Sequence, residues 1–425
     1  MIELFDRFFD ASYTCSDGVR QYLYRDLAPN SVDEALSSPL CAGYERIADR
    51  TVSDNRFVTL HDHEKTLHLA YLAKDKTLTV TTDSLANGVY RKPEKSEIQP
   101  LTKNSFAIMT LDYSKYTCKE GCDPKYDNNG LGYVITLSDG RFIIYDGGYA
   151  YPRANDDEII YEFLRDHNLR PGKPVIAAWI LTHSHNDHYG AFTSFSERFA
   201  HLVELETVVA NTAPAYCYSK GHDATLEDMT KFTKRFGDNT KQIRPHIGQV
   251  LYFGDVEIEV LYTHEQFHFN RLELNQENSA SLVTRITMDG FKFFIPADAM
   301  EAVSMELVRL YGNSLKSDFM QINHHGNRGG KIELYEAVAP SYAMWNTSKY
   351  GLAKRTAGQT YPVGMPHEYD AKLNHRIYTE LGSDHCWCAD DEIDILTVNK
   401  DKTLAVELYT VRPELLPERI PYQPK

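Results

Sequence analysis

The chain has 425 residues, which is too long for one ordinary hydrophobic core and therefore predicts two domains. Its 42% hydrophobic and 25% charged residues are typical of a globular protein in water, and no apolar run is long enough to span a membrane. The net charge of −15 argues against nucleic acid as a partner, because nucleic-acid affinity comes mostly from Lys and Arg contacts with phosphate. A small anionic substrate stays possible, since bound metal ions supply local positive charge.

The ends and the cysteines indicate a cytoplasmic location. The first six residues carry acidic side chains where a signal peptide needs basic ones. The seven cysteines are an odd number and are scattered, which favours reduced thiols over a disulfide framework.

Residues 1–100 are predicted to form a small, mainly β domain. After an irregular beginning, residues 56–60, 67–72 and 77–81 have the composition of strands. The polar segment 91–95 is the expected linker to the rest of the chain. Nothing in this part of the sequence indicates its role.

Two strands are then expected at 133–137 and 141–145, joined by the turn Ser138-Asp139-Gly140. The second strand ends in Asp146-Gly147-Gly148. A helix with one apolar face follows from about residue 155 to 164. The apolar run 175–181 then predicts a fully buried strand.

The buried strand leads directly into His183-Ser184-His185-Asn186-Asp187-His188. Imidazole and carboxylate suit Zn²⁺, and imidazole also suits iron. His183 and His185 point the same way on an extended loop and can bind one metal, whereas Asp187 and His188 follow the turn and can bind a second. Two adjacent metals generate hydroxide and stabilise both attacking and leaving oxygens. The alternative, a polar loop that happens to be rich in histidine, is disfavoured by its position after a buried strand.

Two later strand ends carry further candidate ligands. Hairpins are predicted at 249–262 and at 281–295, and the second leads into Asp298. A further strand at 319–322 ends in Asn323-His324-His325-Gly326. The polar stretch 350–355 is expected to be a loop over the site.

Together these motifs resemble the metallo-β-lactamase superfamily over residues 101–411, with 412–425 as an extended tail. The resemblance implies an α/β fold, the αββα sandwich, beside the small β-rich domain of residues 1–100. It also implies that Asp298 bridges two metals. His183 and His185 would hold the first metal. Asp187, His188 and either His324 or His325 would hold the second, and the remaining histidine would contact substrate or donate a proton to the leaving group.

The third protein ligand of the first metal is open. His264 and His268 are candidates, but neither lies in the thioesterase-type Thr-Pro-Gly-His-Thr run. The Asn278-Ser279 turn is more similar to the competence-protein nuclease branch, in which the first metal would have three protein ligands. For His264, an ordinary loop histidine is the alternative.

The expected function is a dinuclear metal-dependent hydrolase that uses a metal-bound hydroxide on a phosphodiester or related phosphoester. Its cofactors would be two divalent ions, Zn²⁺ with Mn²⁺ or Fe as alternatives. Catalytic roles fall to Asp187, His325 and Asp146, with Asp146 orienting a ligand histidine or the loop. Arg328 and Lys331 are candidates for contact with an anionic substrate, or else ordinary solvated charges. The alternatives are hydrolysis of a lactone, thioester or amide, a diiron oxidoreductase, and a non-catalytic binding module. The sequence does not indicate an oligomeric state.

Overall fold

The computed structural model describes residues 5, 8–14, 19–62, 64–83, 88–111, 130–213, 226–266, 277–358, 370–389 and 392–415. His268 and the predicted tail beyond Leu415 lie outside these residues. Among the helices of the described ranges, none has the length and apolarity needed to cross a membrane.

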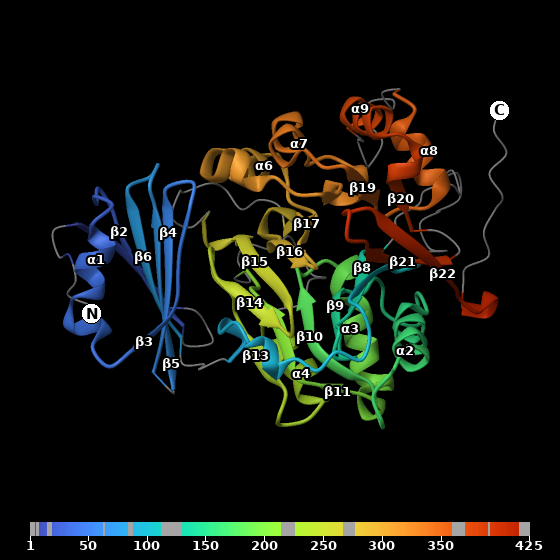
Figure 1. The fold of residues 1–425 in the computed structure, drawn as a ribbon, viewed down its shortest axis with the longest axis horizontal. Coiled ribbons are helices and arrows are strands. Elements are labelled where there is room, and N and C mark those ends of the chain that lie inside the picture. Colours follow the sequence, from blue (N-terminus) through green and yellow to red (C-terminus); the bar gives the residue numbers. More distant parts are fainter. Residues whose placement is uncertain are drawn as a thin grey trace.

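Two mixed β-sheets pack face to face in the larger part of the protein (Figure 1). The first sheet runs, in spatial order, β13 (Lys241–Ile243), β12 (Thr207–Ala210), β10 (Val175–Leu181), β9 (Phe142–Asp146), β8 (Gly132–Thr136), β7 (Ser105–Ile108), β21 (Glu392–Val398) and β22 (Leu404–Thr410), with β11 (Glu204–Leu205) beside β10. The second runs β14 (Val250–Phe253), β15 (Val256–Tyr262), β16 (Val283–Met288), β17 (Phe291–Ile295), β18 (Phe319–Gln321), β19 (Tyr342–Trp345) and β20 (Cys386–Cys388).

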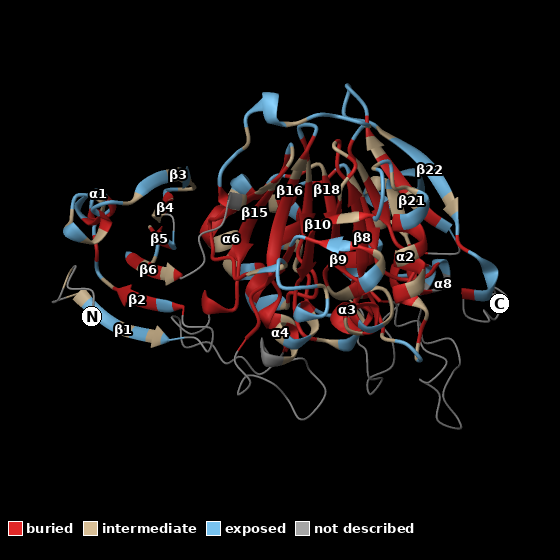
Figure 2. Ribbon diagram, turned by 90° about the horizontal axis from the view of Figure 1, so that it is seen from below, coloured by how far each residue is buried: buried red, intermediate tan, exposed pale blue. Residues whose placement is uncertain are grey.

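Helices cover the outer face of each sheet. One face carries α2 (Asp156–Asp166), α3 (Asn186–Arg198) and α4 (Leu226–Lys234), and the other carries α6 (Glu301–Tyr311), α7 (Ile332–Val338), α8 (Lys349–Thr356) and α9 (Ala371–Leu381). Apolar clusters fill the space between the sheets and beneath each helical layer, so the inner strands are buried on both faces (Figure 2). The predicted αββα sandwich is confirmed.

The site is built where parallel strands end. Strands β9 and β10 are parallel neighbours in one sheet, and β17 and β18 are parallel neighbours in the other. Their carboxyl ends carry Asp146, the histidine loop, Asp298 and the His324-His325 pair, respectively. Because parallel strands end at the same edge of a sheet, residues far apart in sequence converge there.

The N-terminal part forms a separate antiparallel sheet, which confirms the β-rich prediction. Its strands, in spatial order, are β1 (Phe9–Thr14), β2 (Arg20–Tyr24), β6 (Thr77–Asp83), β5 (Lys65–Leu72), β4 (Asn55–Asp62) and β3 (Glu45–Val52), with α1 (Ser31–Leu36) packed on it. The predicted boundary near residue 100 falls in the largely exposed segment between β6 and β7.

This N-terminal sheet shares a hydrophobic cluster with the sandwich. Phe57, Ala70 and Leu72 pack in the same cluster as Tyr262 and Phe294. A buried charge group adds to the contact: Glu259 pairs with Arg50 at 2.7 Å and with Nε of Arg285 at 3.0 Å. The sheet is therefore attached by a dry core and by ions whose separation would leave a buried charge without its partner.

One local prediction was wrong. Residues 350–355 lie within helix α8 and not in a loop over the site. The side chain of Ser348 accepts a hydrogen bond from the backbone N–H of Gly351 and caps the first turn, and this signal was overlooked because the stretch is polar.

Candidate metal centre

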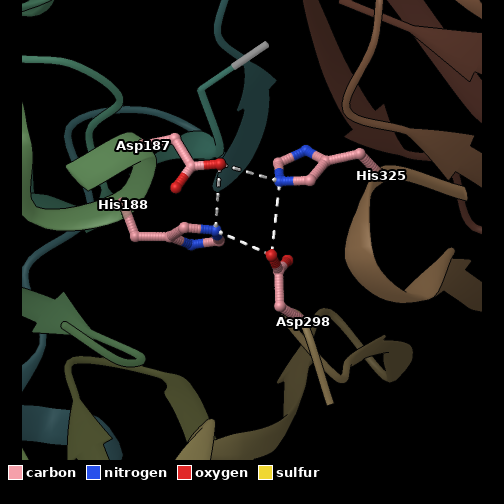
Figure 3. A group of neighbouring side chains, drawn as sticks. All are labelled: Asp187, His188, Asp298 and His325. Carbon is pink, nitrogen blue, oxygen red and sulfur yellow. Dashed lines mark ion pairs between the residues drawn. The ribbon is translucent and has the colours of Figure 1, made fainter. Parts of the chain in front are cut away.

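Four side chains from three segments form the first group of possible metal ligands. They are Asp187, His188, Asp298 and His325, and one ligand atom from each lies within 4.8 Å of the others (Figure 3). Nε2 of His325 is 3.4 Å from an oxygen of Asp187 and 3.4 Å from one of Asp298, and Nε2 of His188 is 3.2 Å from Asp298. Carboxylate oxygen and imidazole nitrogen in this arrangement suit a divalent transition metal.

A second group lies beside the first and shares one member with it. His183, His185 and Asp298 also have ligand atoms within 4.8 Å of one another. Nε2 of His183 and Nδ1 of His185 face each other at 3.1 Å. Asp298 therefore belongs to both groups, as the resemblance implies for a bridging carboxylate.

The polar atoms that face the centre support binding of metal ions. Nε2 of His188, Nε2 of His325 and Oδ1 of Asp298 are buried, and none has a hydrogen-bond partner among the described residues. Leaving such atoms unsatisfied is costly in a protein interior, and a cation bound between them would use all three. The residues present thus fit the two metal ions expected from the sequence.

The electrostatics of the first group fit a cation as well. Burial pushes the pKa of His325 down, but the carboxylates of Asp298 and Asp187 outweigh it and raise that pKa to about 9. Burial likewise opposes charge on Asp298, yet His188 and His325 hold its pKa well below the usual range. Negative charge is thus concentrated between these imidazoles. In the second group, burial and the neighbouring His188 lower the pKa of His183, so its ring is neutral and ready to act as a ligand.

Asp146 holds the histidine loop from beneath. Its carboxylate is fully buried and accepts hydrogen bonds from the backbone N–H of Thr182 at 2.8 Å, from the Thr182 hydroxyl at 2.7 Å and from Nδ1 of His188 at 2.8 Å. The contact fixes the tautomer that leaves Nε2 of His188 as the ligand atom. The geometry is that of the orienting role predicted for Asp146.

Several strand ends at the site adopt left-handed backbone conformations. Asp146 has φ 49°, Ala297 has φ 50°, His324 has φ 49° and His325 has φ 56°. This region disfavours residues with a Cβ, so each position costs free energy, on the order of 1–3 kcal/mol. The surrounding fold holds these turns, and they direct the site side chains inward.

His324 and His325 diverge, as expected for neighbours. His325 belongs to a ligand group and is buried, and its Nδ1 donates to the backbone carbonyl of Asn346 at 3.0 Å. His324 belongs to neither group among the described residues, and its side chain is 20% exposed. Its Nε2 lies 3.8 Å from Asp298, while its Nδ1 donates to the carbonyl of Arg328 at 2.8 Å.

The other predicted residues lie apart from the ligand groups. His264 is buried beside Glu265 but is in neither group that the described residues form. The side chain of Lys331 pairs with Glu301 at 2.7 Å, and that of Arg328 is exposed.

Residues that the sequence analysis did not single out support the centre from outside. Thr182 and Asn346 do so through the contacts above. Glu277 lies 3.6 Å from Nε2 of His185, and the Asn278 side chain lies 3.3 Å from Nε2 of His324. The Asn278-Ser279 turn could have pointed to Glu277. Backbone carbonyls such as that of Asn346 leave no signal in a sequence.

Comparison with known proteins bears on this centre. Residues 127–268 match the family model described as the metallo-β-lactamase superfamily. This region is a metallo-β-lactamase superfamily domain. The match spans the strand end at Asp146 and the whole histidine loop, so it confirms the family resemblance, although it does not distinguish the competence-protein branch from others. Comparison with curated protein sequences gives no match.

Solved structures with a similar fold include three described enzymes or fold members. They are the metallo-β-lactamase fold protein YhfI from Bacillus subtilis (14% identity, TM-score 0.36, 57% of this chain and 85% of that one), the diiron β-hydroxylase CmlA from Streptomyces venezuelae (13%, 0.39, 70% and 54%) and a long form RNase Z from yeast (8%, 0.40, 72% and 50%). The matched region spans about half the length of the last two. At these identities and TM-scores the neighbours carry no information about the reaction.

Proposed function

We propose that the protein is a dinuclear metal-dependent hydrolase whose substrate is a phosphodiester or related phosphoester. The observation that carries this proposal is that Asp298 belongs to both ligand groups. Two metal ions held this way, when bound, activate water and stabilise the attacking and leaving oxygens of an in-line displacement. Zn²⁺ is the proposed ion, and Mn²⁺ or Fe are alternatives.

The chain's own residues have distinct roles in this proposal. His183, His185 and Asp298 hold the first ion, and Asp187, His188, Asp298 and His325 hold the second. Asp146 keeps the ring of His188 in the orientation and tautomer needed.

We assign His324 to proton transfer at the leaving oxygen. Its side chain is partly exposed, its Nε2 points toward Asp298, and its Nδ1 is occupied by the Arg328 carbonyl. Only Nε2 is therefore available to give a proton to a departing alkoxide.

The substrate class is tested with the full chain, stripped of metal and reloaded with Zn²⁺ or Mn²⁺. We expect turnover of bis(p-nitrophenyl) phosphate, and its loss in Asp298→Asn. Turnover of a lactone or thioester without any turnover of the diester would contradict the phosphoester assignment. Iron in excess of zinc in the purified protein, without hydrolysis, would favour the diiron oxidoreductase instead.

The role of His324 is tested with leaving groups of different basicity. The variant His324→Gln should lose about 10²-fold or more in kcat for a methyl ester, whose leaving group needs a proton. It should lose much less for a p-nitrophenyl ester, whose leaving group departs as an anion. Equal losses for both esters would exclude proton donation by His324.

A further inference from the structure

Histidines at the centre share one pattern: the ring nitrogen that faces away from the ligand groups is held by another protein group. Nδ1 of His188, His325, His324 and His183 lies, respectively, 2.8 Å from the Asp146 carboxylate, 3.0 Å from the Asn346 carbonyl, 2.8 Å from the Arg328 carbonyl and 3.2 Å from the Thr182 hydroxyl. Such outer contacts fix the orientation and tautomer of an imidazole and tune its strength as a ligand.

The remaining histidine, His185, presents its two nitrogens the other way round. Its Nδ1 faces Nε2 of His183 at 3.1 Å, and its Nε2 lies 3.6 Å from a carboxylate oxygen of Glu277. The lone pairs of the two ring nitrogens diverge, so a group beside Nε2 does not share an ion bound at Nδ1. Glu277 is 9% exposed, and an acidic side chain is rarely buried that far without a specific partner.

We propose that Glu277 is the positioning carboxylate of His185 and that it sets the affinity of the first metal site. Glu277 would hold His185 with its Nε2–H toward the carboxylate and its Nδ1 lone pair toward the ion. The role mirrors that of Asp146 toward His188 at the second metal, so each site has one buried acid behind one ligand. The inference rests on the metal-dependent function proposed above.

The turn that carries Glu277 is fixed to the histidine loop at several points. The 3₁₀ turn Glu277–Ala280 places Asn278 3.3 Å from Nε2 of His324, and Ser281 just beyond it lies 3.5 Å from Nδ1 of His183. The backbone N–H of Leu282 donates to the carbonyl of Thr182 at 2.8 Å. These contacts hold Glu277 in register with His185, so the ion pair does not depend on one side chain alone.

The test is a zinc titration of the metal-free full chain in competition with a chromophoric chelator. The parent protein should bind two Zn²⁺ with two separable affinities. Glu277→Ala should weaken one site by about 10- to 100-fold and leave the other unchanged. Glu277→Gln, which keeps a hydrogen-bond acceptor, should lie between the two. The exposed Glu336→Gln is the matched control and should behave like the parent.

A second readout identifies which site has changed. Replacing Zn²⁺ by Co²⁺ should give absorption bands from both sites, and Glu277→Ala should lose the bands of the first site only. Asp146→Asn should lose those of the other. Unchanged affinities in folded Glu277→Ala and Glu277→Gln would overturn the inference while the proposed function stands. A parent protein that binds no Zn²⁺, Mn²⁺ or iron would instead overturn the proposed function. Thermal melts of the metal-free variants establish that they are folded.

Discussion

Asp146 accepts a hydrogen bond from Nδ1 of His188 at 2.8 Å, and neither side chain is exposed to solvent. In Asp146→Asn, an amide N–H directed at Nδ1 would force the proton of the ring onto Nε2, which is the ligand atom. We therefore expect the second metal site to weaken by about 10- to 100-fold, while the first stays within a few-fold of the parent. Competitive zinc titration measures both affinities. Equal affinities in variant and parent would show that Asp146 does not orient His188.

Gly190 lies where α3 passes close to the segment after Asp146. A Cβ at this position would stand 2.6 Å from the backbone nitrogen of Ala150 and 2.7 Å from the carbonyl oxygen of Gly148. Backbone atoms cannot rotate away, so Gly190→Ala should destabilise the fold by about 1–3 kcal/mol and displace Asp187 and His188. Urea unfolding and zinc stoichiometry measure the two effects.

The sign of the Gly190→Ala result is informative. Helix propensity alone favours Ala over Gly by about 1 kcal/mol, so a merely exposed helical position would gain stability. Glu197→Ala, an exposed position on the same helix, serves as the control. A stabilised Gly190→Ala with both zinc ions bound would mean that the close approach of these segments does not matter.

The contact between the N-terminal sheet and the sandwich can be tested at Gly248. This residue has φ 81°, and a Cβ built on it would overlap the buried ring of Phe57. Gly248→Ala should therefore lower the free energy of unfolding by several kcal/mol, on the order of 3. Phe57→Ala alone should cost about 3–5 kcal/mol because it leaves a cavity.

The double variant decides whether these two residues meet. If they do, Gly248→Ala adds less in the Phe57→Ala background than in the parent, because the clash is gone and the added methyl partly fills the cavity. Chemical denaturation of all four proteins gives the coupling free energy. Strict additivity would place the two residues out of contact.

A pH dependence follows from His68, which lies at the same contact. Burial, with the nearby charge of His246, lowers the pKa of His68 to about 3; Glu265 also faces this pair. Between pH 3 and the unfolded value of about 6.5, the unfolded chain binds a proton at this residue and the folded protein does not. Its contribution therefore favours folding above pH 6.5 and is lost on acidification, by about 2 kcal/mol between pH 6.5 and 5.

Urea midpoints at pH 6.5 and 5 measure this contribution. His68→Gln cannot titrate, so its stability should fall less between the two pH values than that of the parent, although it is less stable at both. The exposed His201→Gln is the control and should follow the parent. Identical slopes in the parent and His68→Gln would show that His68 is not held neutral.

Much of the sandwich and its centre could be predicted from local patterns. Buried strands such as Val175–Leu181 appear as continuous apolar runs, and the residue that follows each parallel strand is fixed by the chain. Asp298 could be placed with His188 because both follow core strands of a recognisable fold.

What was missed has physical reasons. Strand β3 (Glu45–Val52) lies at a sheet edge with little burial, so it has no apolar alternation to reveal it. The choice between His324 and His325 depends on two consecutive left-handed residues, which the sequence does not encode visibly. Glu277 and His185 are joined only by tertiary structure, and an isolated glutamate is typical of a solvated surface.

The common cluster of Phe57, Leu72 and Tyr262 has a consequence for the cleaved protein. The exposed segment between β6 and β7 is the natural place for a protease to cut, but a cut there severs the chain without separating the dry surfaces on either side. The two fragments should migrate together in a native gel and part only in denaturant, so an intact peptide bond is not what holds the halves in one particle.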